Sequence, residues 1–263
     1  MINVILFNKT DQLLLSQFKK YSSPWFSYKG TYNRKTPFYY SNKDFDWAEK
    51  LESAYFNDIK PEIEAFMKAK GHALDPYFNV DLVGNKSSWK IGGFYFWGNK
   101  IEDHYKYIPK LEKLLTNIPG FVSAGISFLE PKTDIKVHNG DTDASVRAHL
   151  GLKIPAELPT CGIEVGDEQR GWEEGKVIIF NDAQKHRAWN HSDKTRYVLI
   201  IDIIKPEYLK QSKAICANAM SLIKLQQLEY QFALVRNSPG PIKGIFRFFC
   251  KIHSLFSSKY DFH

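Results

Sequence analysis

Histidine is the residue type in this chain best suited to bind a metal, because neutral imidazole is a common ligand for iron and related ions. Taken singly, a histidine is more often a surface or hydrogen-bonded residue than a ligand. A group of histidines in one segment, together with other charged side chains, favours a site. Four of the eight histidines fall in a segment with a strand-like pattern: His138, His149, His186 and His191.

Two arginines accompany these histidines. Arg147 and His149 are two residues apart, so on a strand they point to the same face. Arg196 opens the apolar run R-Y-V-L-I-I-D-I-I. A guanidinium inside a β core is costly unless it meets an anion, and it binds a carboxylate bidentately. Because no matching run of acids lies inside these strands, we interpret the group as a site for a metal and a dicarboxylate rather than as structural ion pairs.

The elements that position these residues are predicted to be short strands. Gly/Pro/Asp/Asn-rich turns separate them, and this arrangement favours a sandwich or jelly roll over a parallel α/β sheet. The expected strands are Val122–Leu129, Val146–Lys153, Gly162–Val165, Lys176–Phe180 and Thr195–Ile204. We therefore predict a mainly β fold with flanking helices, with its core in residues 121–206.

Helices are expected on both sides of this core. Apolar residues at a spacing of three to four predict a helix over 44–68, interrupted near Pro61, and another before the Asn117–Gly120 turn. Residues 1–120 are thus expected to be a helical support, and the whole of 1–206 a single catalytic domain. The aromatic run Phe94–Trp97 is interpreted as core.

Residues 207–263 are expected to form a basic helical extension. They hold eight Lys/Arg against three Asp/Glu, and so carry +5 of the net charge of +7. The last predicted helix, 242–259, has its cations Lys243, Arg247 and Lys251 on one face and its apolar residues on the other. This pattern is typical of a peripheral membrane contact, although a solvated helix face is the plainer alternative.

The cysteine spacing, the motifs and the apolar stretches of the sequence argue against several other classes of protein. Three widely spaced cysteines outside any CxxC pattern indicate neither a disulfide framework nor a zinc knuckle. No RNP, zinc-finger or helix-turn-helix signature is present, so we expect no nucleic-acid partner. No apolar stretch approaches the length of a membrane span, and Met1–Thr10 is too short for a secretory signal. A cytoplasmic location, possible also at the membrane surface, is expected.

Three segments carry a resemblance to a known family. They read H-N-G-D-T-D-A-S-V-R-A-H-L-G-L-K-I-P, G-D-E-Q-R-G-W-E-E-G-K-V-I-I-F-N-D and H-R-A-W-N-H-S-D-K-T-R-Y-V-L-I-I-D-I-I-K-P. The stretch from Ser127 to Pro206 resembles the catalytic domain of the aspartyl/asparaginyl β-hydroxylase family, which includes lipid A acyl hydroxylases. The resemblance implies a double-stranded β-helix, a cupin-like jelly roll, that uses Fe(II), 2-oxoglutarate and O2 and releases succinate and CO2.

The resemblance also implies roles for individual residues. His138 and His186 would be the iron ligands. Arg147 and His149 would lie by the oxalyl end of 2-oxoglutarate, and Ser127 with Arg196 would bind its distal carboxylate. Three positions are interpreted as structural, for packing or turn geometry: Trp172, Gly175 and Trp189. Asp182 matches an acidic position upstream of the second ligand and is interpreted as structural support.

One departure concerns the third iron ligand. Enzymes of this chemistry commonly use two histidines and a carboxylate two residues after the first histidine, and that position is Gly140 here. Lipid-hydroxylating relatives have Asp there, whereas the animal peptide hydroxylases resemble this chain in having Gly. Either water or Asp141, one residue further on, would complete the shell.

The substrate expected from Gly140 is an Asp, Asn or related residue of a peptide or protein, which would be β-hydroxylated. The basic amphipathic end motivates an alternative, hydroxylation of an acyl chain on a membrane lipid, and a free amino acid is a third possibility. A different class is a β-helix that binds a carboxylate without activating oxygen. The missing carboxylate ligand is the best support for that alternative.

Overall fold

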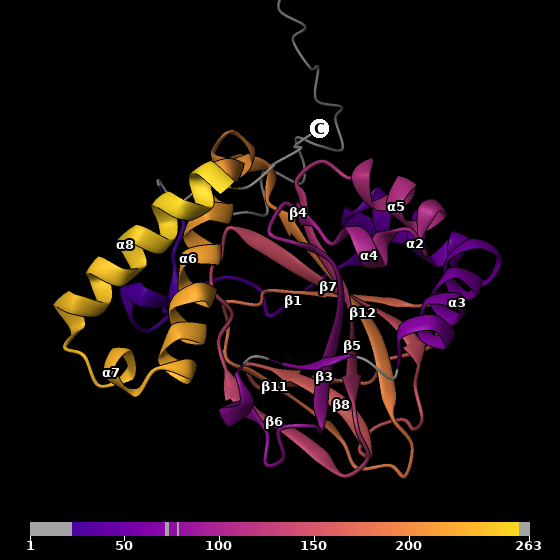
Figure 1. Ribbon diagram of the computed structural model, residues 1–263. Helices are drawn as coiled ribbons and strands as arrows, with labels where there is room; N and C mark the ends of the chain where they lie inside the picture. The colour runs from indigo at the N-terminus through magenta and orange to yellow at the C-terminus, as the bar shows by residue number, and fades with distance from the viewer. Residues whose placement is uncertain (1–22, 72–73, 78, 258–263) are drawn as a thin grey trace, which may run out of the picture.

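The computed structural model describes residues 23–71, 74–77 and 79–257. Two antiparallel sheets face each other, and the N-terminal helices cover the outer face of the larger sheet (Figure 1). In the described part of the chain the larger sheet has the order β1-β10-β7-β12-β5-β3-β2, with β4 beside β3, and the smaller sheet has the order β6-β11-β8-β9. The strands of the larger sheet are β1 (Tyr39–Tyr40), β2 (Asp75–Pro76), β3 (Trp89–Phe96), β4 (Asn99–Lys100), β5 (Phe121–Leu129), β7 (Ser145–Lys153), β10 (Val177–Phe180) and β12 (Arg196–Ile204); those of the smaller sheet are β6 (Thr133–His138), β8 (Cys161–Val165), β9 (Glu168–Arg170) and β11 (His186–Asn190).

From β5 to β12 the chain crosses repeatedly between the two sheets. β5, β7, β10 and β12 lie in the larger sheet, while β6, β8, β9 and β11 lie in the smaller one. This winding is a double-stranded β-helix, so the predicted fold class is confirmed. The five predicted strands agree with β5, β7, β8, β10 and β12 to within one residue at each end. The prediction missed β6 and β11, which carry His138 and His186.

Three apolar clusters form the core. The first packs the outer face of the larger sheet, including Ile126 and Leu199, on Leu51 and Phe66 of the N-terminal helices. The second lies between the sheets, and the third joins the sheet edge to the helix α6. Period-two alternation along β5 and β12 thus divides their residues between the helix-covered face and the interior. The helices are α2 (Asp46–Ala54), α3 (Lys60–Lys70), α4 (Glu102–Tyr105), α5 (Pro109–Thr116), α6 (Ser212–Gln231), α7 (Ala233–Arg236) and α8 (Gly240–Ser257).

The helical support is confirmed in part. A π-helical turn, Tyr55–Ile59, separates α2 from α3, whose second residue is Pro61, so the predicted interruption lies just before this proline. The expectation of helical structure throughout is wrong for 89–96, because β3 pairs with β5 in the larger sheet. Phe94, at its end, is fully buried, as expected for core. Residues 1–22 of the expected support lie outside the described residues.

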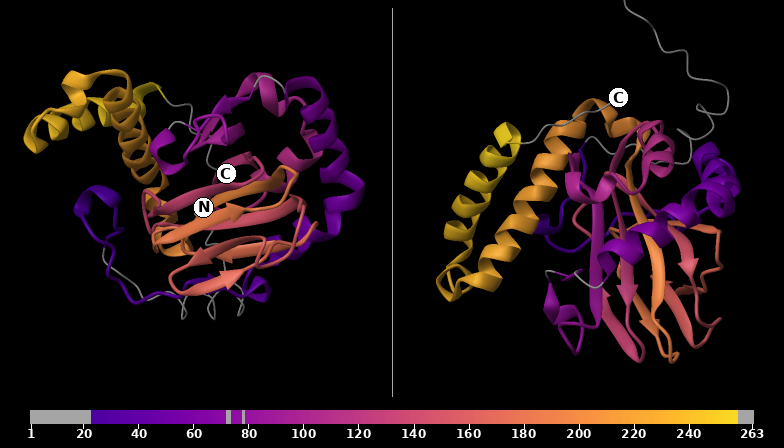
Figure 2. Two further views of the ribbon diagram at one scale, coloured as in Figure 1. Left: turned by 90° about the horizontal axis from the view of Figure 1, so that it is seen from below. Right: turned by 45° about the vertical axis from the view of Figure 1, so that its right-hand side comes forward.

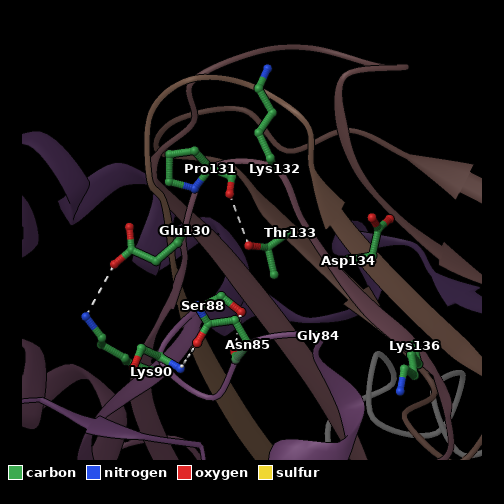
Figure 3. Close-up of a pocket in the computed structure, with 11 residues that line it drawn as sticks. Gly84, Asn85, Ser88, Lys90, Glu130, Pro131, Lys132, Thr133, Asp134 and Lys136 are labelled. Carbon is green, nitrogen blue, oxygen red and sulfur yellow. Dashed lines mark hydrogen bonds and ion pairs between the residues drawn. The ribbon is translucent and has the colours of Figure 1, made fainter.

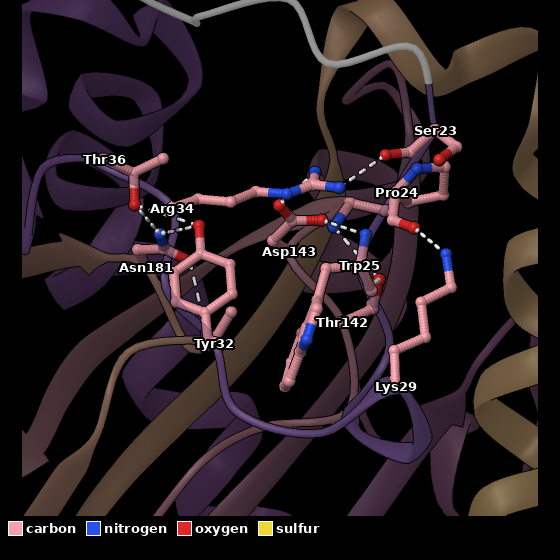
Figure 4. A network of polar contacts seen from close by, with 12 residues as sticks. Ser23, Pro24, Trp25, Lys29, Tyr32, Arg34, Thr36, Thr142, Asp143 and Asn181 are labelled. Atoms are coloured by element: carbon pink, nitrogen blue, oxygen red, sulfur yellow. Dashed lines mark hydrogen bonds and ion pairs between the residues drawn. The ribbon is translucent and has the colours of Figure 1, made fainter.

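The segment 23–36 is fastened across the β-helix by a polar network (Figure 4). Arg34 forms an ion pair of 2.7 Å with Asp143, which also accepts a hydrogen bond from the backbone N–H of Trp25. Asn181, just after β10, donates to Thr36 over 2.7 Å. The segment therefore connects the loops before β7 and after β10, at the end of the β-helix where the second histidine begins β11.

After β12 a short 3-10 helix, Pro206–Gln211, leads into α6, and α8 returns along it (Figure 2). The predicted last helix is confirmed up to Ser257, and its final residues lie outside the described part of the chain. The division into a catalytic domain, 1–206, and an extension, 207–263, stays a prediction. None of the described helices is both long and apolar enough to cross a membrane.

Candidate metal and carboxylate site

The two predicted iron ligands lie side by side. His138 ends β6 and His186 begins β11, and these neighbouring antiparallel strands place the two residues opposite each other. Their ring centroids are 4.1 Å apart. The register shifts between His138 and Ile135 of β6, which holds one residue more than the paired stretch from His186 to Ala188 of β11, and such a bulge is a common device for re-aiming a side chain near a site. The fold thus brings together two histidines that are far apart in the sequence.

Both rings are oriented by backbone of their own strand or loop. Nδ1 of His138 lies 2.8 Å from the carbonyl oxygen of Lys136, and Nδ1 of His186 lies 2.9 Å from that of Gln184. Since a carbonyl only accepts, each Nδ1 carries the proton, and each Nε2 keeps its lone pair. Burial lowers the pKa of His138 to about 3 and that of His186 to about 4. Both rings are therefore neutral near pH 7, the form that binds a metal.

Arg196 is a buried cation without an acidic partner in the described residues. Its side chain is 1% exposed, and its contacts are the backbone and hydroxyl oxygens of Ser127, at 3.5 and 3.3 Å, and the ring of Trp172. Nε of Arg196 has no partner. Burial lowers the pKa of this guanidinium to about 10. The Ser127 hydroxyl also accepts a hydrogen bond from Trp89, so its own proton is available to a ligand.

His149 is the second orphaned polar group here. It is buried, and neither of its ring nitrogens has a hydrogen-bond partner. Burial, followed by the charge of Arg196, holds its pKa well below the usual range. Trp172 stacks beside it, with ring centroids 6.0 Å apart. Since buried polar groups are normally satisfied, His149 and Arg196 together indicate a polar ligand.

These groups share one cavity of about 120 Å³ between the two sheets. His138, His186, His149, Arg196 and Ser127 all line it. Its walls include further residues from β3, β5, β12 and α6, among them Trp89, Ile91, Gly93, Trp97, Gly125, Asp202 and Ile223. Of these, Trp89 was missed by the sequence analysis, because an indole N–H that orients a serine has no sequence signal.

Arg147 also lines the cavity, but its charge is already compensated. Its guanidinium donates to both carboxylate oxygens of Asp202, at 2.7 and 3.1 Å, and to Asp182 at 2.6 Å. These acids raise its pKa against the effect of burial. The expectation that the strands hold no matching acid is therefore wrong for Arg147, because Asp202 lies opposite it on β12. The expectation holds for Arg196. The role of Arg147 towards 2-oxoglutarate stays a prediction.

The room beside Gly140 is taken by Asp182. A Cβ added at Gly140 would lie 1.5 Å from Oδ2 of Asp182, whose other oxygen is 3.4 Å from Nε2 of His186. The carboxylate of Asp182, from the loop between β10 and β11, thus occupies the space that a side chain at position 140 would need. Asp141 lines the cavity as well, and burial together with Asp182 raises its pKa to about 7.

A second hollow lies apart from this cavity and shares none of its lining residues (Figure 3). It is bordered by the β5–β6 turn and by the loop before β3. Lysines and acids line it together, and Lys90 pairs with Glu130 over 3.4 Å. Its charges are thus largely balanced within the hollow. We find no basis there for a ligand site.

Comparison with known proteins identifies the family of the chain. The model of the aspartyl/asparaginyl β-hydroxylase family matches residues 53–206, more than half of the chain. The chain belongs to this family. The match includes every described strand except β1, and all of the predicted site residues.

Two curated relatives differ in substrate by name. Over 170 residues the chain is 34% identical to an ornithine lipid ester-linked acyl 2-hydroxylase of Rhizobium tropici, a match that covers 64% of this chain and 60% of that protein. Over 151 residues it is 33% identical to the human aspartyl/asparaginyl β-hydroxylase, covering 56% of this chain and 19% of that protein. The chain therefore spans only part of each relative.

Among solved structures, a viral collagen prolyl hydroxylase from Paramecium bursaria Chlorella virus-1, in complex with 2-oxoglutarate, matches 57% of this chain and 92% of its own. The identity is 13% and the TM-score is 0.38. This likeness is too remote to support an inference about the site.

Proposed function

We propose that the chain is an Fe(II)- and 2-oxoglutarate-dependent hydroxylase in which His138 and His186 hold the iron. The two neighbouring imidazole rings, both neutral and each with its Nδ1 bound to a backbone carbonyl, support this proposal. Imidazole suits Fe(II), and the orienting carbonyls supply the support that metal-bound histidines usually have. Membership of a hydroxylase family agrees with it.

The observation that carries the proposal is the uncompensated charge of Arg196. A buried guanidinium is tolerated when an anion meets it, and the described residues provide none. The distal carboxylate of 2-oxoglutarate has the required charge and would bind both Arg196 and the free Ser127 proton. His149, with both nitrogens unpaired in the same cavity, would satisfy another polar group of the cosubstrate.

In the mechanism, iron with 2-oxoglutarate and O2 supplies, when bound, the decarboxylation of the cosubstrate to succinate and CO2 and the transfer of one oxygen atom to a C–H bond. The chain's own residues bind and orient. Arg196 and Ser127 would hold one end of the cosubstrate, and the two histidines would hold the metal. Arg147, held by Asp182 and Asp202, keeps a fixed position on the cavity wall. Enclosure between the sheets limits the access of water.

Asp182 and Asp141 are the two groups that would complete the surroundings of the metal. Asp182 lies beside His186 and occupies the room of the missing acid at position 140. Its carboxylate is paired with Arg147 and held in place by it. Asp141 reaches the same cavity from the segment after β6. Water thus remains our proposed third ligand.

Two substrates remain candidates. Gly140 motivates an Asp or Asn residue of a peptide or protein, as in the human relative's name. A specific observation favours the second, a lipid acyl chain. Several of the residues that line the cavity, among them Gly93, Gly125, Trp97 and Ile223, offer little polar recognition. An unbranched acyl chain fits such a wall. The acidic side chain of a peptide substrate would require an unpaired cation, and Arg147 is already paired with Asp182 and Asp202.

The proposal is tested with purified protein, Fe(II), ascorbate, 2-oxoglutarate and O2, with succinate followed by NMR. Wild type should form succinate, and both His138→Ala and Arg196→Met should lose this activity. Peptides and membrane lipids are then screened for a mass increase of one oxygen atom. Absence of iron binding and of succinate would instead support the carboxylate-binding module.

A further inference from the structure

The outermost element of the described chain is α8, which returns antiparallel to α6 and forms the far edge of the molecule (Figures 1 and 2). One of its faces packs on α6. Ser254 is fully buried there, and Cys250 is partly buried. The opposite face meets no other described element.

This outward face is almost wholly apolar. Its residues recur at intervals of three and four, as expected for one side of a helix. They are exposed by 37% or more: Ile242 by 44%, Ile245 by 57%, Phe248 by 59%, Phe249 by 63%, Ile252 by 37% and Phe256 by 86%. At the turn between α6 and α8, Phe232 (53%) and Leu234 (83%) extend the same character. A contiguous apolar patch of this kind on a folded protein marks an interaction site.

Two of the three cations of α8 lie on its inner side. Lys243 forms an ion pair of 2.9 Å with Glu229 of α6, and Arg247 lies over the ring of Tyr28 with 3.6 Å to its centroid. A helix that only covers a core in water has the opposite arrangement, with apolar residues inward and cations outward. Polar contacts thus hold α8 in an orientation that exposes its phenylalanines.

Charge indicates the kind of partner. Between residues 207 and 257 there are seven Lys/Arg (Lys210, Lys213, Lys224, Arg236, Lys243, Arg247 and Lys251) and two acids, Glu207 and Glu229. A net charge of +5 on the segment that carries this apolar face is complementary to an anionic lipid surface, into whose acyl boundary the phenylalanines would insert. A second copy of this chain would bring like charges together. Since no described helix can span a bilayer, α8 would lie in the plane of the interface.

We propose that the outward face of α8, with the α6–α8 turn, docks the protein on an anionic lipid bilayer. This surface is independent of the iron and 2-oxoglutarate site.

Flotation of the full chain with vesicles tests the proposal. Phosphatidylcholine vesicles are compared with vesicles that also contain phosphatidylglycerol. The variant Phe248→Ser/Phe249→Ser removes two exposed rings, and Phe56→Ser is the matched control, because Phe56 is 65% exposed in the turn between α2 and α3. These two helices lie across the sheets from α8 (Figure 1). Wild type and control should float with the anionic vesicles, and added salt should reduce binding. The double variant should lose on the order of tenfold in binding per ring.

Several outcomes would overturn the proposal. Wild type that does not float with anionic vesicles, or a double variant that floats equally well, excludes α8 as a membrane surface. Equal binding to both vesicle types excludes the role of charge. Sedimentation equilibrium of wild type and double variant, without lipid, tests a second copy: a dimer that the double variant abolishes would make the face a protein interface. Because flotation needs no turnover, its failure is distinct from a failure of the succinate assay.

Discussion

Replacing Arg196 by methionine should stabilise the protein and abolish binding of 2-oxoglutarate. The guanidinium is 1% exposed, and burial lowers its pKa to about 10. Relative to the ordinary arginine pKa this decrease corresponds to about 3 kcal/mol of unfavourable free energy for the charged form. Folding depresses the pKa of a cation here, so the cost is present in full below pH 10 and disappears only above the pKa in the unfolded chain.

The net gain is smaller than this cost, because the substitution also removes the contacts with Ser127 and Trp172. About 1 kcal/mol is lost with them. We expect the metal-free variant to be about 2 kcal/mol more stable than wild type, which raises its unfolding temperature by about 5 °C. Methionine retains the aliphatic stem and adds no cavity of consequence.

The assay is thermal unfolding near pH 7.5, with and without 2-oxoglutarate and Mn(II) as an inert substitute for iron. Wild type should gain stability from the ligands, and Arg196→Met should gain none from 2-oxoglutarate. Arg187→Met is the matched control, because Arg187 is exposed and paired with Glu164, and it should leave both results unchanged. A variant that is less stable than wild type, or that still responds to 2-oxoglutarate, would refute the reasoning.

Three further predictions concern the metal side of the cavity. His138→Ala should abolish stoichiometric iron binding, measured by metal analysis, while the unfolding free energy of the metal-free protein changes by no more than about 1 kcal/mol. Gly140→Asp should lower the free energy of unfolding by about 2 kcal/mol or more, because the new Cβ would overlap Asp182. Adding Asp182→Gly should restore most of this stability in a double-mutant cycle. Additive effects of the two substitutions would contradict the overlap. Asp202→Asn should lower the free energy of unfolding, measured in urea, by about 3 kcal/mol, because Arg147 would keep only Asp182 as an acidic partner. An unchanged urea midpoint would show that the pair with Asp202 contributes nothing to stability.

The strands and the helical flanks could be predicted from the sequence because they depend on local periodicity. β5 and β12 alternate between a helix-covered face and the interior, and Gly- or Pro-rich turns bound them. β6 and β11 escaped the prediction because polar residues interrupt their pattern. These residues include the two histidines, so the site itself obscured the strands that carry it.

The contacts of the site depend on register, which local patterns do not give. Arg147 and Asp202 are 55 residues apart, and they meet because β7 pairs with β12 in one register. The same holds for Asp182, which fills the space at Gly140 from across a loop. By contrast, the isolation of Arg196 could be predicted, since the neighbouring strand residues are apolar. The orientation of α8 could not, because an amphipathic pattern does not specify which face turns outward.

The carbonyl groups that orient His138 and His186 have a consequence for how the site tolerates change. Each ring is held by a backbone oxygen two residues before it, and not by a side chain. Substitution of Lys136 or Gln184 therefore leaves the acceptor in place. Substitutions at these neighbouring positions should therefore leave the orientation of the two histidine rings unchanged. Other residues around the cavity can vary with the substrate, while the backbone continues to orient the two histidine rings.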